Sequence, residues 1–161
     1  MIRQLTGRLI EAEPTGVVID VAGVGYGVIV PMSTYDCLPR VGEVVTLLTH
    51  LAVREDAFTL YGFASAKERA LFNLLTGVTG IGPRLALSVL SSMPASIFCA
   101  AVAEGDVKAL SRINGIGKRS ADRLVLELKD KVAAVSPDAA FAKGTEGGEW
   151  SREAQDAVAA L

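Results

Sequence analysis

The sequence is poor in the residues from which metal centres and nucleophilic active sites are usually built. Its 161 residues include only two cysteines and one histidine. Cys37 and Cys99 lie far apart without a CxxC spacing, which favours ordinary buried thiols in a reducing compartment over a zinc or redox centre. His50 lies in an apolar stretch where a structural role is expected, and no Ser/His/Asp or Cys/His arrangement stands out. We therefore expect no catalytic residue, no bound metal and no cofactor.

Long apolar runs are also absent from the sequence. Although 50% of the residues are hydrophobic, charges or glycines interrupt every apolar run well before membrane-spanning length. The start of the chain lacks a basic segment followed by an apolar one. These features predict a cytoplasmic protein without membrane contact. The chain is long enough to form one large domain or two small ones, and its hydrophobic core needs neither disulfides nor metal.

The net charge of -2 hides an uneven distribution along the chain. Residues 1–64 carry four basic and seven acidic side chains, and residues 133–161 carry two and five. Between them, residues 65–132 carry ten basic and six acidic side chains, a net charge of +4. A basic middle segment in an acidic chain indicates where a nucleic-acid partner would bind.

The first part of the chain has the pattern of a small β-barrel. Five short runs rich in Val, Ile, Leu, Thr and Tyr occur at residues 5–10, 17–21, 26–30, 44–53 and 58–61. A glycine turn at 23–25 separates the second and third runs, and residues 33–38 suggest one helical turn. The pattern predicts a five-stranded OB-type barrel over residues 1–64, although a sandwich fragment could show similar periodicity.

The periodicity becomes helical at Ser65, where Ser65 and Glu68 have the spacing of a capping box. The sequence predicts an all-helical domain over residues 65–133, a flexible linker over 134–149 that is rich in small and polar residues, and a short terminal helix in 150–161. Within the helical domain, further helices are predicted at residues 83–90, 94–103, 107–112 and 118–132.

An internal repeat provides the main functional signal. Residues 78–86 (VTGIGPRLA) and 113–121 (INGIGKRSA) superimpose at an offset of 35, with Gly, Ile, Gly, Arg and Ala coinciding. Each copy follows one amphipathic helix and opens another, which is the helix-hairpin-helix pattern. Glycine permits positive φ and close approach of a ligand, and the intervening isoleucine can pack into the helix pair. Free amides at the start of the second helix then form an anion site suited to a DNA phosphate.

Basic residues accompany both copies, which predicts salt-sensitive binding to the DNA backbone without readout of bases. A Gly-Ile-Gly sequence alone could be only a tight turn between helices. A P-loop is excluded because arginines stand at positions 112 and 119, where it needs Gly and Ser or Thr. The predicted DNA-binding residues are Gly80, Ile81, Gly82, Arg84, Gly115, Ile116, Gly117, Lys118, Arg119 and Arg123.

Two adjacent carboxylates, Glu55 and Asp56, lie in the predicted turn between the last two strands. A solvated acidic turn is the simplest interpretation. A metal-dependent nuclease would need further carboxylates converging on the same point, and the sequence shows no such set.

The order of barrel, paired hairpins, linker and terminal helix resembles the bacterial RuvA family over essentially the whole chain. Several strings are similar to that family's, namely GVGY at 23–26, VRED at 53–56, LYGF at 60–63, GPRLA at 82–86 and GIGK at 115–118. The resemblance implies a homotetramer, or a face-to-face octamer, that binds four-way (Holliday) junction DNA in recombination, repair and the SOS response. It also implies that Glu55 and Asp56 form an acidic pin near the junction centre.

The same resemblance implies two protein partners, a RuvB-type hexameric ATPase and a RuvC-type resolvase. In the family, a small three-helix, UBA-like domain after the linker engages the ATPase. Here only its first helix, residues 153–161, is expected, so we expect the terminal domain to be incomplete and coupling to the motor to be impaired.

Two other functions compete with this interpretation. Helix-hairpin-helix modules also deliver catalytic domains to DNA, but no residues remain here to form such a domain. A barrel that binds single strands needs exposed aromatic side chains, whereas those of this barrel are expected mainly in core positions, namely Tyr26, Tyr35, Phe58, Tyr61 and Phe63.

Overall fold

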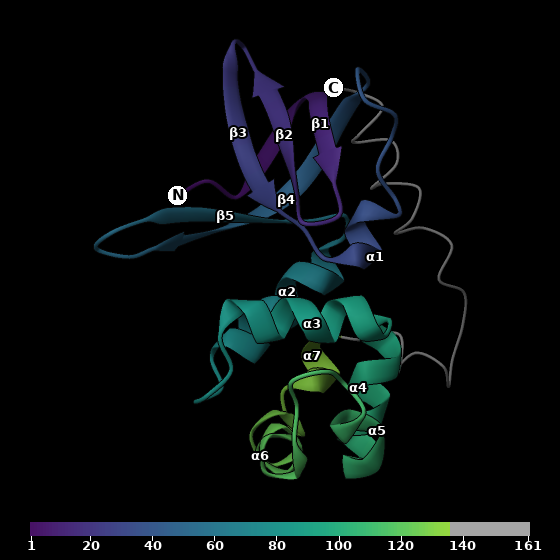
Figure 1. Ribbon diagram of the computed structural model, residues 1–161. Helices are drawn as coiled ribbons and strands as arrows, with labels where there is room; N and C mark the ends of the chain where they lie inside the picture. Colours follow the sequence, from purple (N-terminus) through teal and green to yellow (C-terminus); the bar gives the residue numbers. More distant parts are fainter. Residues whose placement is uncertain (136–161) are drawn as a thin grey trace.

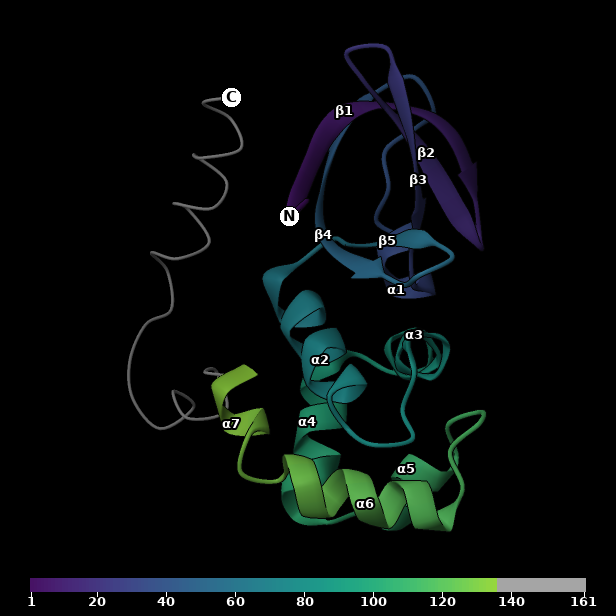
Figure 2. The same ribbon diagram turned by 90° about the vertical axis from the view of Figure 1, so that its left-hand side faces the viewer.

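The computed structural model describes residues 1–135, which form a β-barrel followed by a helical bundle (Figures 1 and 2). The barrel elements are β1 (Gln4–Glu13), β2 (Gly16–Val21), β3 (Val24–Ile29), α1 (Met32–Tyr35), β4 (Val44–Val53) and β5 (Phe58–Phe63). The helices are α2 (Ala66–Thr76), α3 (Pro83–Ser92), α4 (Ala95–Glu104), α5 (Val107–Ser111), α6 (Lys118–Leu128) and α7 (Val132–Val135). This arrangement confirms the predicted OB-like barrel and helical domain.

The barrel closes in the strand order β1-β2-β3-β5-β4. Its neighbouring strands are antiparallel except β3 and β5, which pair in parallel at Val28 with Leu60 and Ile29 with Tyr61. Side chains alternate between interior and surface, as expected for strands with one buried face. The interior is filled by aliphatic residues, namely Leu5, Leu9, Val17, Ile19, Val28, Val30, Val45, Leu47 and Leu60.

The helices share a second hydrophobic core, which begins at the last barrel strand. Phe63, at the end of β5, is fully buried and belongs to the helical core. Its ring lies 4.9 Å from that of Phe72 in α2, and the Phe72 ring also contacts His50 and Tyr61. His50 thus lies in an aromatic cluster between the barrel and the helices, a position that agrees with the structural role predicted for it.

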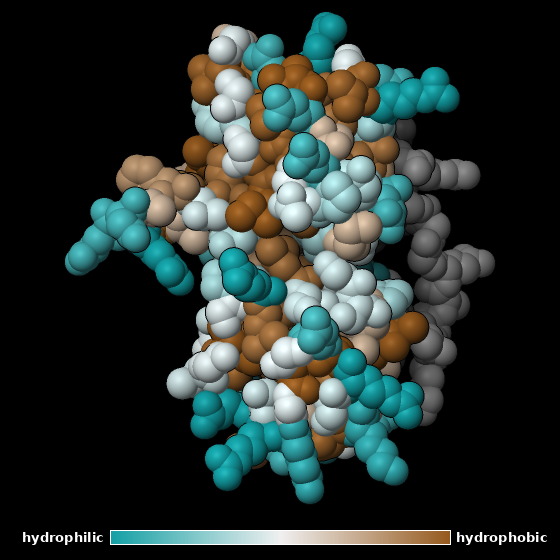
Figure 3. Space-filling view, in the orientation of Figure 1, coloured by the Kyte–Doolittle hydropathy of each residue, from teal (hydrophilic) through white to brown (hydrophobic). Residues whose placement is uncertain are grey.

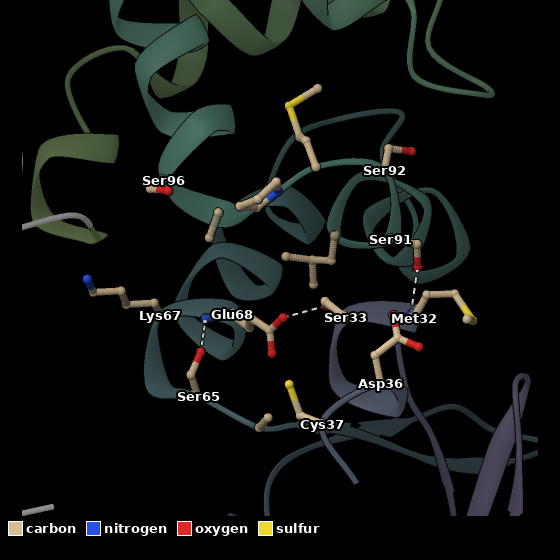
Figure 4. Close-up of a pocket in the computed structure, with 15 residues that line it drawn as sticks. Met32, Ser33, Asp36, Cys37, Ser65, Lys67, Glu68, Ser91, Ser92 and Ser96 are labelled. Atoms are coloured by element: carbon tan, nitrogen blue, oxygen red, sulfur yellow. Dashed lines mark hydrogen bonds between the residues drawn. The ribbon is translucent and has the colours of Figure 1, made fainter. Parts of the chain in front are cut away.

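Hydrogen bonds join α1 of the barrel to the helices (Figure 4). The Ser65 hydroxyl accepts from the Glu68 amide, as the capping box predicts. The Glu68 carboxylate accepts hydrogen bonds from the hydroxyls of Ser33 and Thr34 in α1. The Met32 amide also donates to the hydroxyl of Ser91 in α3, at 3.0 Å. Glu68 therefore connects the two parts of the chain in addition to lying in the first turn of α2.

Three sequence-based expectations need correction. Cys37, expected to be a buried thiol, is exposed in the connection between α1 and β4, whereas Cys99 is buried. The helix predicted over 118–132 ends at Leu128, and the short helix α7 follows it. Val132 and Val135 of α7 are buried in the helical core, so ordered helix extends beyond the predicted start of the linker at residue 134. Phe58 does not have a core position, because 76% of it is exposed. The rest of the predicted linker and the terminal helix lie outside the described residues.

No single helix among residues 1–135 is long and apolar enough to cross a membrane. In this described part, α3 and α4 would together be long and apolar enough, but the chain bends by 100° between them.

Candidate nucleic-acid interface

The first hairpin, residues 77–82, connects α2 to α3. Gly80 has a φ of 87°, a left-handed conformation that favours glycine. Ile81 is buried, and its amide donates to the Val78 carbonyl at 3.0 Å, which closes the turn. Gly82 is the N-cap of α3 and provides no side-chain cap. The first turn of α3 therefore presents backbone amides without intrahelical partners.

The second hairpin, residues 112–117, repeats this geometry between α5 and α6. Gly115 has a φ of 89°, and the amide of the buried Ile116 donates to the Ile113 carbonyl at 3.0 Å. Gly117 is the N-cap of α6, again without a side-chain cap. The first glycine of each pair thus has the positive φ that the pattern predicts, and both isoleucines are packed into the core. Gly82 and Gly117 have negative φ and leave the helix N-termini without a side-chain cap.

Most of the predicted basic residues are exposed beside these N-termini. Arg84 is the second residue of α3, and Lys118 and Arg119 are the first two residues of α6. Hydrophilic side chains project from the end of the molecule where α5 and α6 lie (Figure 3). An anion approaching either helix would meet amide donors, the positive end of the helix dipole and at least one cation.

Arg123 differs from the other predicted cations. It is exposed on α6, but its guanidinium Nη1 donates to the carbonyl of Thr79 in the first hairpin, at 3.1 Å. The sequence suggested a charge beside the second hairpin, and the structure instead directs this side chain to the first. Sequence analysis also missed Ser88, whose hydroxyl donates to the Asn114 carbonyl in the second hairpin at 3.1 Å.

The acidic residues Glu55 and Asp56 lie at the tip of the β4–β5 hairpin, where the Arg54 amide donates to the Ala57 carbonyl at 2.9 Å. Both carboxylates are exposed. In Figure 1 this hairpin projects from the barrel toward the same side as the α2–α3 connection. Among residues 1–135 no three His, Cys, Asp or Glu residues are grouped so that they could hold a metal ion.

In a comparison with known proteins, the barrel and the helical part of the chain each match a family model. Residues 1–62 match the family model of the RuvA N terminal domain, and residues 72–130 match that of the SAM-like helix-hairpin-helix tandem. A protein of Chromobacterium violaceum named Holliday junction branch migration complex subunit RuvA is 57% identical over 133 residues, covering 83% of this chain and 68% of the relative. A protein of the same name from Actinobacillus pleuropneumoniae is 44% identical, covering 100% of this chain and 84% of the relative. The chain belongs to the RuvA family.

For this RuvA-family chain, the two matched regions contain all the predicted DNA-binding residues and both carboxylates of the acidic turn. The N-terminal match includes the acidic turn with Glu55 and Asp56, and the tandem match includes both hairpins. A third relative, from Thioalkalivibrio sulfidiphilus, has the same name and is 46% identical, covering 100% of this chain and 82% of its own length. The comparisons identify the family, and the individual site residues remain predictions that rest on the geometry above.

Proposed function

We propose that this chain is the DNA-binding subunit of a branch migration complex, which recognises four-way junctions without reading their sequence and holds them open. The supporting observation is the pair of equivalent hairpins, each ending in an uncapped helix N-terminus beside exposed cations, in a chain of the RuvA family. The relatives are named for Holliday junction branch migration, and this role is the one we extend to the present chain.

The hairpins suit phosphate groups and not bases. Their donors are backbone amides at the starts of α3 and α6, and the glycines leave room for a phosphate to approach, since a Cβ built at Gly82 or Gly117 would meet no atom within 4 Å. Contacts of this kind position a protein on the DNA backbone and carry no sequence information. Binding should therefore be independent of sequence and should weaken steeply with salt.

The acidic turn supplies discrimination between DNA structures. Glu55 and Asp56 lie at the end of a projecting hairpin and would repel phosphates brought close to them. At the centre of an open junction, the strands separate and leave space for this tip. A continuous duplex places phosphates across that space, so the carboxylates disfavour duplex relative to the junction.

Assembly and partners complete the proposal. A junction has four arms, and a homotetramer with cyclic symmetry would offer each arm one pair of hairpins; two such tetramers could also enclose the junction as an octamer. The chain would have no catalytic site of its own, so a RuvB-type ATPase would supply the motion and a RuvC-type resolvase the cleavage. In this scheme residues 1–64 assemble the oligomer and carry the pin, and residues 65–133 bind DNA. Residues 150–161, joined by the linker at 134–149, belong to the part of the protein that faces the motor.

The direct test is competition among a synthetic four-way junction, a linear duplex and a single strand of the same length. We expect the junction to bind tightest, with affinity independent of sequence. Equal affinity for junction and duplex at moderate salt would refute junction recognition. Preference for the single strand would instead support binding on the barrel, for which the exposed Phe58 is the available stacking residue.

A charge substitution tests the hairpin itself. Lys118→Ala should weaken junction binding and lower the slope of log affinity against log salt by about 1, because one phosphate contact is lost. Lys131→Ala is the matched control, since this exposed lysine follows the opposite end of α6. If both variants leave affinity and slope unchanged, the second hairpin is not a phosphate site.

A further inference from the structure

The two hairpins are connected by a reciprocal pair of hydrogen bonds. Ser88, on the second helix of the first motif, donates to the Asn114 carbonyl in the second hairpin. Arg123, on the second helix of the second motif, donates to the Thr79 carbonyl in the first hairpin. Ser88 and Arg123 are related by the offset of 35 residues that relates the two motifs, and so are Thr79 and Asn114. Each motif therefore uses the same helix position to hold the same carbonyl of the other motif.

The positive-φ glycines show the same exchange between motifs. The nearest atom to a Cβ built at Gly80 would be Nη1 of Arg123, at 3.7 Å. The nearest atom to a Cβ built at Gly115 would be Cδ1 of Leu85 in α3, at 2.8 Å. Each hairpin is thus bordered, at its most constrained residue, by a side chain from the opposite motif.

The two hairpins differ in the number of basic residues that they carry themselves. The second hairpin begins at Arg112 and leads into Lys118, whereas the first has Gly77 and Pro83 at the equivalent positions. Arg84 is the one basic residue between positions 77 and 86. Arg123 adds a guanidinium to this poorly charged hairpin, and only one of its nitrogens is engaged by Thr79 in the bond described. A guanidinium has five N–H donors, so others remain for an anion.

We propose that each hairpin is completed by the opposite motif: Arg123 positions the first hairpin and adds its charge there, and Ser88 positions the second hairpin. The inference rests on the proposed function in taking the hairpins as phosphate sites. Its distinct content is that Arg123 serves the hairpin 44 residues before it in the sequence, and not the one beside it. Substitutions in one motif should therefore alter the phosphate contacts made by the other.

The first measurement needs no DNA. Backbone amide NMR spectra of the free chain are compared for the wild type, Arg123→Gln and Ser88→Ala. Arg123→Gln should shift the Gly80 and Ile81 amides and leave those of the second hairpin in place, and Ser88→Ala should do the reverse. Ser92→Ala is the control for Ser88, because the Ser92 hydroxyl donates within α3, to the Ser88 carbonyl. Shifts confined to the hairpin of the substituted motif would overturn the proposal.

The second measurement is hydroxyl-radical footprinting on a synthetic four-way junction. Arg84→Gln defines the phosphates held by the first hairpin, and Lys118→Gln those held by the second. Arg123→Gln should lose protection at the Arg84 set, whereas Ser88→Ala should lose it at the Lys118 set. Loss at the Lys118 set in Arg123→Gln would show that Arg123 is an ordinary contact of its own hairpin, and would refute the proposal.

Affinity and salt dependence separate positioning from direct charge. Ser88→Ala removes no charge, so junction binding should weaken about two- to tenfold, the effect of one hydrogen bond, with an unchanged salt slope. Arg123→Lys keeps the positive charge but removes the planar guanidinium. This variant should bind junctions more weakly, with an unchanged slope of log affinity against log salt. If neither variant changes affinity, positioning is refuted. If the wild type fails to bind junctions while the amide shifts cross between motifs, the proposed function fails and the exchange between hairpins stands.

Discussion

The positive-φ glycines of the hairpins allow a quantitative prediction about stability. Gly80 and Gly115 have φ values of 87° and 89°, and both become strained when replaced by alanine. A left-handed conformation costs an alanine about 1–2 kcal/mol. The lower entropy of the unfolded alanine chain returns about 0.4–1 kcal/mol. We therefore expect Gly80→Ala to lower the free energy of unfolding by about 1 kcal/mol, since its new Cβ would lie 3.7 Å from the nearest atom, an ordinary contact.

Gly115→Ala should be more destabilising than Gly80→Ala. Its new Cβ would lie 2.8 Å from Cδ1 of Leu85, so that side chain must move. An off-rotamer displacement costs about 0.5–1.5 kcal/mol, which brings the expected loss to about 2 kcal/mol. Gly117→Ala is the matched control, because its φ of −88° suits any residue and a Cβ there meets nothing within 4 Å. Its effect on stability should be close to zero, because the entropy gain of the unfolded alanine chain is offset by the weakness of alanine as an N-cap residue.

Urea unfolding followed by circular dichroism measures these three variants against the wild type. The expected order of destabilisation is Gly115→Ala, then Gly80→Ala, then Gly117→Ala. Equal stability of Gly115→Ala and Gly117→Ala would contradict the left-handed conformation of the second hairpin. Equal losses for Gly80→Ala and Gly115→Ala would show that the Leu85 contact carries no cost. Junction binding provides a separate result, because Gly117→Ala should weaken it while the fold stays stable.

Three further predictions concern charge, thiols and energy supply. Neutralising the pin with Glu55→Gln and Asp56→Asn should raise affinity for linear duplex more than for junctions in a binding titration, and an unchanged ratio would remove the pin from specificity. An alkylating reagent should modify the exposed Cys37 rapidly and Cys99 only on unfolding, as measured by mass spectrometry. Burial raises the pKa of the Cys99 thiol and so disfavours the reactive thiolate. Equal rates of alkylation at the two cysteines would contradict this prediction. The purified chain should not hydrolyse ATP, and an ATPase activity that follows it through purification would refute a purely DNA-binding role.

Local sequence patterns predicted much of this structure because the features concerned are local. Alternating apolar residues specify the strands, and glycine at positions 80 and 115 marks the positive-φ residue of each DNA-binding hairpin. The same reasoning did not predict the exposure of Phe58, which pairs with Val53 at the end of the β4–β5 hairpin. A strand pattern identifies an aromatic residue but does not show that its part of the hairpin projects beyond the barrel.

Long-range hydrogen bonds could not be predicted because nothing in the local pattern specifies their partners. Glu68 has the spacing of a capping box in the sequence. Only the folded chain shows that its carboxylate accepts hydrogen bonds from the hydroxyls of Ser33 and Thr34 in α1. Arg123 likewise follows a basic hairpin in sequence, and only the packing of α6 shows that its guanidinium extends to Thr79. The repeat offset contained a usable signal, since it pairs Ser88 with Arg123, but the significance of that pair depends on how the motifs face each other.

The two motifs share their buried positions and differ in their charges. Ile81 and Ile116 are equally buried, as are Ala86 and Ala121, because the same packing must form on both sides of the pair. Their surfaces need not match, and the second hairpin carries more positive charge than the first. The second hairpin should therefore supply more of the electrostatic attraction to DNA. The bond from Arg123 to Thr79 partly compensates for this difference, because it places a cation of the second motif at the first hairpin.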